Sequence, residues 1–323
     1  MNKTSIEWAL NPDGSPGYTH NPMSGCRYHT PDGLCLGGMF PCYAHKLANG
    51  RLKGLILGKT MTRVKAGFHR GNFLPPGSPQ YALTDPFYPR FWSYRLNELA
   101  KRNDRLHYDG PKVKYPITPR GIFLGDMADL FGVGVPHEWS EMVLDEIWGN
   151  KGYDRFYILT KQAQRLAEFP PFPDNCWVGV TATDQTMVLE ATNYLYEHRI
   201  AKTQFLSIEP LLSWDTSHFI HPLAAHISKR DIDWLIIGAC TGTYSEITQL
   251  CALKNMAYTD KQQYGQLWTL QPKIEWVREI IKAADAAGIR VFLKDNLRPL
   301  FAREIEGTYQ TGYPGGQYRQ EVP

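Results

Sequence analysis

The sequence predicts an α/β protein built around a parallel sheet. From residue 121 onward, short and almost continuously apolar runs recur, and helical patterns lie between most of them. Strands that are buried on both faces of a parallel sheet read in this way, whereas half-exposed strands alternate apolar and polar residues. Alternating strands and helices indicate βαβ units. The expected strands are residues 4–10, 121–126, 155–161, 176–182, 203–210, 233–239 and 290–295.

Helices are expected between these strands. The clearest patterns cover residues 136–150, 184–198 and 273–288, and the last ends at Gly288, as a helix C-terminus commonly does. A further helix is expected over residues 42–54. Residues 250–273 are interpreted as an insertion before the last helix, and residues 301–323, rich in Gly, Gln and Tyr, as an irregular C-terminal tail.

The composition is that of a globular protein. The chain has 323 residues, 43% of them hydrophobic, which is enough for one large domain or for two. No apolar run approaches the roughly 18–20 residues that cross a bilayer, and the N-terminus lacks the apolar segment of a signal peptide. We therefore expect a cytoplasmic protein without a membrane partner, in which thiols stay reduced.

The charge is distributed unevenly along the chain. Residues 51–120 contain 14 Lys and Arg but only 4 Asp and Glu, and aromatic residues are interleaved with the basic ones. Such a basic excursion suits a polyanion, for example a nucleic acid, and the alternative is a solvated surface on which Arg side chains pack against rings. The basic residues expected to face a substrate are Arg63, Lys65, Arg70, Arg95, Arg102 and Arg105, and the expected stacking rings are Phe68, Phe73, Phe91 and Trp92.

Polar residues follow the apolar core of most expected strands. In parallel α/β folds, ligands bind at the carboxyl ends of the strands, so polar residues there are candidates for a shared site. The alternative is that strand ends border solvent and are polar for that reason. The candidates for cofactor binding are Asp126, Thr160, Lys161, Thr181, Glu209 and Lys294.

Three of the six cysteines lie close together in the stretch "MSGCRYHTPDGLCLGGMFPCYA" (residues 23–44). Cys26, Cys35 and Cys42 suit a [4Fe–4S] cluster with one iron left open. A zinc ion with one of His20, His29 or His45 as a further ligand, or three free thiols, are the alternatives. The other cysteines, Cys176, Cys240 and Cys251, are expected to be structural.

Nine motifs in order resemble those of one protein family. They include "TSIEWALNP", "PCYAHKLA", "GDMADLF", "ILTKQAQRL", "WVGVTATDQ", "FLSIEPLL" and "FLKDN", and together they span residues 3–296. The family is encoded by phages and bacteria, is of unknown function, carries a three-cysteine motif and resembles radical-SAM enzymes. In this chain Cys35 and Cys42 are six residues apart, where family members usually have two, and Gly37 and Gly38 would help the longer loop turn.

The resemblance implies both a fold and an activity. It implies a partial (β/α) TIM-like barrel over residues 1–300, with a [4Fe–4S] cluster on the three cysteines and S-adenosylmethionine on the open iron. Such an enzyme generates a 5′-deoxyadenosyl radical with an electron from a donor such as flavodoxin or ferredoxin. The basic excursion favours a nucleic acid or nucleotide as the substrate. A peptide or small metabolite is the alternative substrate, and a non-catalytic nucleic-acid-binding protein stabilised by zinc or a cluster is the alternative class.

Overall fold

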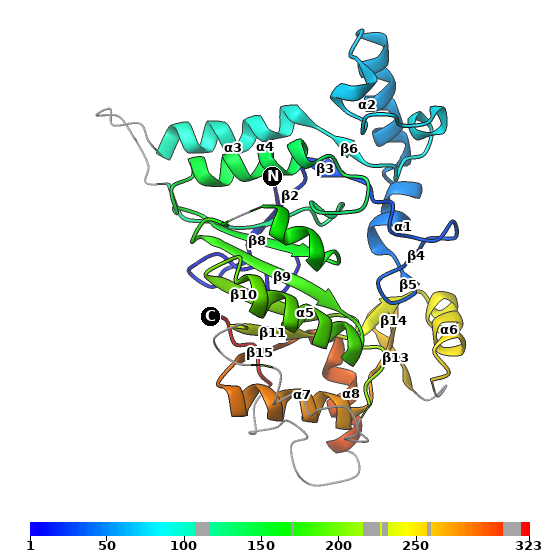
Figure 1. The fold of residues 1–323 in the computed structure, drawn as a ribbon. Helices are drawn as coiled ribbons and strands as arrows, with labels where there is room; N and C mark the ends of the chain where they lie inside the picture. The colour runs from blue at the N-terminus through cyan, green and yellow to red at the C-terminus, as the bar shows by residue number, and fades with distance from the viewer. Residues whose placement is uncertain (107–116, 170, 216–226, 228–231, 257–259, 306–317) are drawn as a thin grey trace. The chain divides into compact units, whose positions relative to one another are not determined.

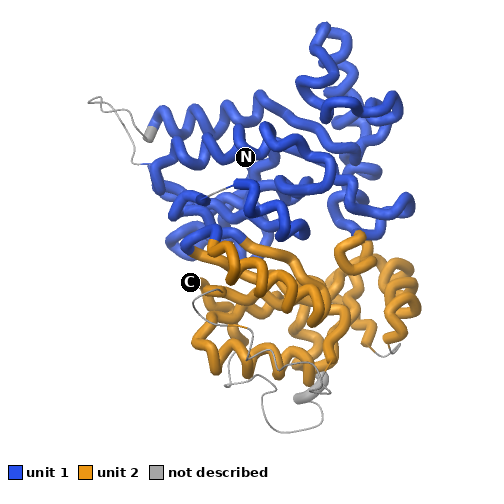
Figure 2. Tube along the Cα trace, viewed as in Figure 1, with its two compact units in different colours: residues 1–35, 42–178, 200–202 blue, residues 36–41, 179–199, 203–323 orange. Residues whose placement is uncertain are grey.

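The computed structural model describes the chain except for residues 107–116, 170, 216–226, 228–231, 257–259 and 306–317. The chain divides into two compact units (Figure 2). Unit 1 comprises residues 1–35, 42–178 and 200–202, and unit 2 comprises residues 36–41, 179–199 and 203–323.

Unit 1 contains a parallel sheet with one antiparallel edge strand. Its strand order is β1 (Asn2–Lys3), β2 (Tyr18–His20), β7 (Gly121–Leu124) and β8 (Arg155–Thr160). Strands β2, β7 and β8 are parallel, with Ile122 opposite both Tyr18 and Phe156. All four residues of β7 are buried, as its continuously apolar sequence predicts. Strand β9 (Cys176–Ala182) begins in unit 1 and continues in unit 2.

The prediction of a first strand at residues 4–10 is wrong. These residues form turns, in which Ala9 N donates to Ile6 O (3.1 Å), and β2 takes the place beside β7. The turn backbone passes so close to β7 that a Cβ added at Gly121 would lie 1.9 Å from Leu10 O. Trp8 is nevertheless buried, so this apolar segment fills the core without pairing in the sheet.

The helices of unit 1 are α1 (Tyr43–Asn49), α2 (Lys53–Lys65), α3 (Ser93–Leu106) and α4 (His137–Gly149). The helix expected over residues 42–54 is thus divided into two, with Gly50 after the first. Helix α3 packs against α4 (Figure 1). The remaining short elements are β3 (Met23–Ser24), β4 (Leu34–Cys35), β6 (Arg90–Phe91), and 3-10 turns at Arg70–Asn72, Gln80–Leu83 and Ala163–Glu168.

Unit 2 contains a second set of parallel strands, in the order β10 (Thr203–Ile208), β11 (Trp234–Ile237) and β15 (Arg290–Leu293). A three-stranded antiparallel sheet holds β12 (Cys240–Gly242), β14 (Leu267–Leu270) and β13 (Lys261–Tyr264). The other elements are β5 (Phe40–Pro41), α5 (Gln185–His198), α6 (Tyr244–Leu253), α7 (Ile274–Ala287), the 3-10 turn Asp295–Leu297 and α8 (Arg298–Ile305).

The insertion and the C-terminal tail predicted from the sequence lie partly outside the described residues. The insertion expected at residues 250–273 contains the end of α6 and the β13–β14 hairpin, and its residues 257–259 lie outside the described part of the chain. The tail expected to be irregular begins inside α8, and its residues 306–317 are not described. After them the chain returns to β15, where Leu293 N donates to Arg319 O (2.8 Å).

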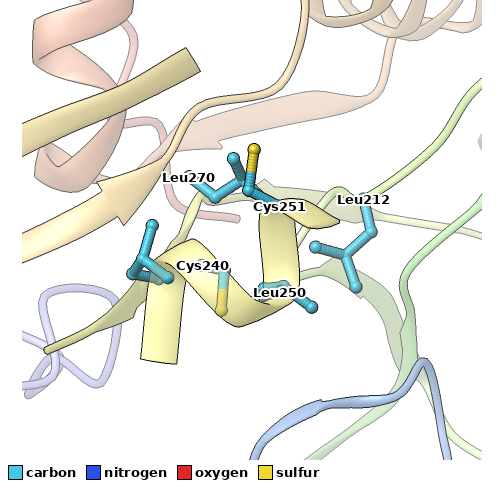
Figure 3. Packing of buried hydrophobic residues seen from close by; sticks show 6 residues of the cluster. Leu212, Cys240, Leu250, Cys251 and Leu270 are labelled. Carbon is cyan, nitrogen blue, oxygen red and sulfur yellow. The ribbon is translucent and has the colours of Figure 1, made fainter. Parts of the chain in front are cut away.

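Three cysteines have structural surroundings, as expected. Cys240 and Cys251 pack with Leu212, Leu250 and Leu270 in a buried apolar cluster of unit 2 (Figure 3). Cys176 is completely buried in β9.

The parallel α/β class is confirmed, and the partial barrel stays a prediction. None of the described helices combines the length and apolar character needed to cross a membrane.

Candidate functional site

The backbone holds Cys26 beside the loop that follows β7. Gly25 N donates to Met127 O (2.9 Å), and Cys26 N donates to Phe87 O (3.0 Å). Gly25 has a φ of +88°, and an added Cβ would lie 2.4 Å from a backbone oxygen, so this position requires glycine. Cys26 therefore lies near the carboxyl end of a parallel strand, where ligands bind in α/β folds.

Cys35 and Cys42 flank residues 36–41, which belong to unit 2. Cys42 is the N-cap of α1, and its Sγ accepts a hydrogen bond from His45 N at 3.5 Å. Its own N–H donates to Gly33 O (3.0 Å), while Cys35 forms an isolated antiparallel bridge with His29. Both cysteines are thus tied into the fold of unit 1 by local backbone contacts.

The three thiols have apolar surroundings and influence one another. Cys26 and Cys42 pack against an apolar cluster of unit 1, and Cys35 is buried. Burial, followed by the charges of Asp129 and of the other two cysteines, raises the pKa of the Cys26 thiol to about 12. Three ionised thiols would therefore be costly here without a cation to compensate their charge.

The chemistry of the three thiols fits an iron–sulfur cluster, because Cys thiolates are the usual ligands of such clusters. Among the described residues, however, no group of three or more His, Cys, Asp or Glu side chains is arranged to hold a metal ion. None of the six cysteines forms a disulfide. Ligation by Cys26, Cys35 and Cys42 therefore stays a prediction.

Two histidines lie beside the cysteine loop. The rings of His29 and His45 are 4.8 Å apart, and both pack against Phe87 at 5.3 Å. Burial, followed by the charge of His29, lowers the pKa of His45. His20 lies instead on β2, where its Nδ1 is 3.9 Å from a Glu98 oxygen. Of the histidines considered for zinc, His29 and His45 are the two that lie together.

Asp129 joins the ends of two neighbouring strands. Its carboxylate accepts hydrogen bonds from Thr160 Oγ1 (2.7 and 2.9 Å) and from Lys161 N (2.9 Å). The same carboxylate raises the pKa of Cys26, so its charge acts on the cysteine loop. The Lys161 ammonium makes no hydrogen bond or ion pair with the part of the chain that the structure describes.

Asp126 lies in the loop after β7 and is largely buried. The Asn21 side chain donates to it, and Asn21 Oδ1 accepts from Met127 N (3.1 Å). Burial raises the pKa of Asp126, while the bond from Asn21 and the charge of Arg95 partly oppose this rise.

The remaining predicted residues lie in unit 2. Glu209 and Lys294 form an ion pair, and a Cβ added at Gly238 would lie 3.1 Å from the side chain of each. Thr181 is buried on β9, and its hydroxyl finds no hydrogen-bond partner among the described residues. An orphaned buried hydroxyl is uncommon in folded proteins and suits a ligand atom.

Two groups of residues therefore emerge. In unit 1, Thr160 and Lys161 meet at Asp129, whose charge acts on Cys26, and in unit 2 Glu209 meets Lys294. Whether both groups serve one site stays a prediction. Sequence reasoning missed Asp129, although its place three residues after Asp126, in the same strand-end loop, was a usable signal.

Residues 3–266 match a family described as "Protein of unknown function (DUF5131)", and the chain belongs to this family. The expectation of a family of unknown function is confirmed, while its phage origin and cysteine motif stay predictions. No curated protein matches the sequence.

Two solved structures are similar in fold. One is spore photoproduct lyase complexed with dinucleoside spore photoproduct, with 13% identity, a TM-score of 0.42, and coverage of 67% of this chain and 71% of that one. The other is a cysteine-to-serine mutant of spore photoproduct lyase, with 12% identity, a TM-score of 0.48, and coverage of 91% and 80%.

Proposed function

We propose that the protein is a radical S-adenosylmethionine enzyme that acts on a nucleic acid or nucleotide. The observation that carries the proposal is the position of Cys26, from the three-cysteine loop, beside the loop that follows β7, because the neighbouring Gly25 N donates to Met127 O. This edge of a parallel sheet is where α/β proteins bind cofactors.

Cys26, Cys35 and Cys42 would hold a [4Fe–4S] cluster. When bound, such a cluster supplies the electron that cleaves S-adenosylmethionine and starts radical chemistry on the substrate. The apolar residues around Cys26 and Cys42 would exclude water from that chemistry. An electron donor such as flavodoxin or ferredoxin is part of the proposal.

The strand-end residues would bind and orient S-adenosylmethionine. The Lys161 ammonium, free of partners among the described residues, suits the methionine carboxylate, and Asp129 fixes Thr160 beside it. Asp126 is the carboxylate proposed for the ribose hydroxyls or the methionine ammonium. In unit 2, Thr181, Glu209 and Lys294 are proposed to contact cofactor or substrate, with Lys294 held by Glu209 until a ligand competes for it.

The test is anaerobic reconstitution with iron and sulfide, followed by quantification of both and a search for 5′-deoxyadenosine. We expect about four irons per chain and absorbance near roughly 400 nm, as a [4Fe–4S] cluster requires. Each of Cys26→Ala, Cys35→Ala and Cys42→Ala should lose the iron. Cys251→Ser is the matched control, because this thiol lies in unit 2 and donates to Met256 O (3.0 Å), which a serine hydroxyl can also do. Full iron content in Cys35→Ala would remove that residue from the ligand set.

A structural zinc site is the second candidate, because the rings of His29 and His45 lie 4.8 Å apart beside Cys42. Metal analysis separates the two candidates. Zinc that is lost in both His29→Ala and His45→Ala, without any bound iron, would support the zinc site and overturn the radical enzyme.

A further inference from the structure

The structure divides the basic residues of the 51–120 stretch into two groups. Arg70 donates to three groups of residues 78–80. Arg90 is completely buried and donates hydrogen bonds to four groups of the protein interior. Arg102 forms a bidentate pair with the buried Asp154. These three guanidinium groups stabilise the fold, and the expectation that Arg70 and Arg102 face a substrate is not supported by their contacts.

Three other cations gather around one exposed tyrosine. Lys59 and Arg63 come from α2, and Arg95 comes from α3, next to Tyr94. Lys59 Nζ donates to Tyr94 Oη (3.1 Å). The guanidinium groups of Arg63 and Arg95 lie 5.4 and 5.8 Å from the centre of the same ring. With Phe68, these residues are called the basic–aromatic cluster; its helices are labelled in Figure 1.

The rings of this cluster have different exposures. Arg63 lies 5.9 Å from Phe73 and 5.6 Å from Trp92, which are both buried, and 5.4 Å from Phe68. Phe68 is 49% exposed and Tyr94 is 41% exposed. Arg63 therefore packs on two buried rings, and the two partly exposed rings lie beside it at the surface. Phe73, Phe91 and Trp92 are too buried to stack on a ligand, so of the four rings expected to stack only Phe68 is available.

The cations of the cluster have no acidic partner within hydrogen-bond distance among the described residues. Arg95 Nη1 donates to Asn21 O (2.6 Å), and Lys59 donates to Tyr94. The Arg63 guanidinium lies near four rings and makes no hydrogen bond or ion pair with the described residues. Glu98 and Asp126 feel the charge of Arg95 without forming an ion pair with it. Holding three like charges together is unfavourable, and a bound anion would relieve it.

The chemistry of the cluster fits a single-stranded nucleic acid. Guanidinium and ammonium groups bind phosphates, and an exposed ring beside them can stack on an unpaired base. In a duplex the bases are stacked on one another and are not available to Phe68. An acidic peptide could bind the cations but has no base to stack on Phe68. A strand with both phosphates and unpaired bases uses every member of the cluster.

We propose that Lys59, Arg63 and Arg95, with Tyr94 and Phe68, bind the phosphate backbone and a base of single-stranded nucleic acid. As a description of substrate binding this rests on the proposed function, but the binding itself requires no metal. Three phosphate contacts on a single strand predict a salt slope of about −2, or a roughly fifteenfold loss of affinity from about 50 to 200 mM salt.

The test is fluorescence anisotropy of the metal-free, full-length protein with a labelled oligothymidine of about 20 nucleotides, at several salt concentrations. The double variant Lys59→Ala/Arg63→Ala should lose at least about tenfold in affinity, and its salt slope should become shallower by about 1.4. The control Arg51→Ala/Lys53→Ala removes the same charge from exposed positions just before and at the start of α2, outside the cluster. It should change affinity by less than about threefold.

Phe68 provides a second readout. Phe68→Ala should weaken binding by about tenfold and leave the salt slope unchanged, because stacking involves no counterions. Equal losses in the two double variants would overturn the proposal. Equal affinity for duplex DNA and for the single strand would also overturn it. So would an unchanged affinity of Phe68→Ala, if heparin also bound as tightly as the oligonucleotide.

The failure of this proposal can be distinguished from failure of the proposed function. Oligonucleotide binding by a protein that takes up no iron would support nucleic-acid binding by the basic–aromatic cluster and overturn the proposed enzymatic function. Iron uptake and 5′-deoxyadenosine formation without oligonucleotide binding would support the enzymatic function and overturn nucleic-acid binding by the cluster.

Discussion

Asp129 accepts hydrogen bonds from Thr160, from Lys161 N and from Phe131 N (3.0 Å), and its charge acts on Cys26. A carboxylate with this many donors is held in one orientation and has little freedom to seek other partners. At the scale of single residues, the candidate site of unit 1 is therefore organised by a side chain that takes its partners from two strand ends.

His20 illustrates how burial and a nearby positive charge can make a residue sensitive to pH. It is 2% exposed on β2, and its Nε2 has no partner among the described residues. Burial, followed by the charge of the N-terminal amine, lowers its pKa from 6.5 to about 4. The unfolded chain therefore binds the proton more tightly than the native state between these pH values.

We predict that the free energy of unfolding falls as the pH drops from 6.5 to about 4. These are the pKa values of His20 in the unfolded and in the native chain. The contribution of His20 is at most roughly 3 kcal/mol. Urea unfolding at several pH values measures it. His20→Gln should flatten the pH dependence, whereas the exposed His69→Gln should leave it as in the wild type. An identical pH dependence in His20→Gln and wild type would contradict this explanation.

At the scale of elements, glycine marks where the backbone of one segment touches another. An added Cβ at Gly121, in β7, would lie 1.9 Å from Leu10 O, whereas one at Gly58, in α2, would meet nothing within 4 Å. The first position is set by tertiary packing, and the second is an exposed helix interior in which glycine is merely a weak helix former.

These two positions should respond oppositely to the same substitution. Gly121→Ala should lower the free energy of unfolding by about 3 kcal/mol or more, because backbone atoms must move apart. Gly58→Ala should raise it by about 0.5–1 kcal/mol, because alanine loses less entropy in a helix. Denaturant unfolding of both variants beside the wild type is the measurement. A Gly121→Ala protein as stable as the wild type would show that the close approach to Leu10 is not required.

At the scale of the whole molecule, the cysteine loop is shared between two compact units. Cys26, Cys35 and Cys42 belong to unit 1, while residues 36–41 belong to unit 2. A cluster bound by the three cysteines would bind the native chain and not the unfolded one, so it should stabilise the protein by mass action.

We therefore expect the reconstituted protein to melt about 5 °C or more above the metal-free protein. Cys26→Ala should show no such increase, and Cys251→Ser should show the same increase as the wild type. Differential scanning calorimetry of all three proteins, with and without iron and sulfide, provides the comparison. An equal increase in Cys26→Ala would mean that the metal binds elsewhere.

The class of fold and the candidates for the site could be predicted from the sequence. Six of the seven expected strands are present as strands, because a strand that is buried on both faces must be apolar throughout, and this is visible locally. The exception, residues 4–10, mixes buried apolar side chains such as Trp8 with polar ones such as Glu7 and forms no strand, since local sequence records burial and not hydrogen-bond partners.

Which side chains meet could not be predicted in this way, because it depends on how distant segments pack. Asp129 and Thr160 are 31 residues apart, and Arg102 and Asp154 are 52 residues apart, so no local pattern could pair them. The same holds for the basic stretch, where charge counts treat Arg90 and Arg63 alike although one is buried and the other faces exposed rings. Composition specifies which groups are present, but the approach of distant segments determines which charges are compensated and which remain available to a ligand.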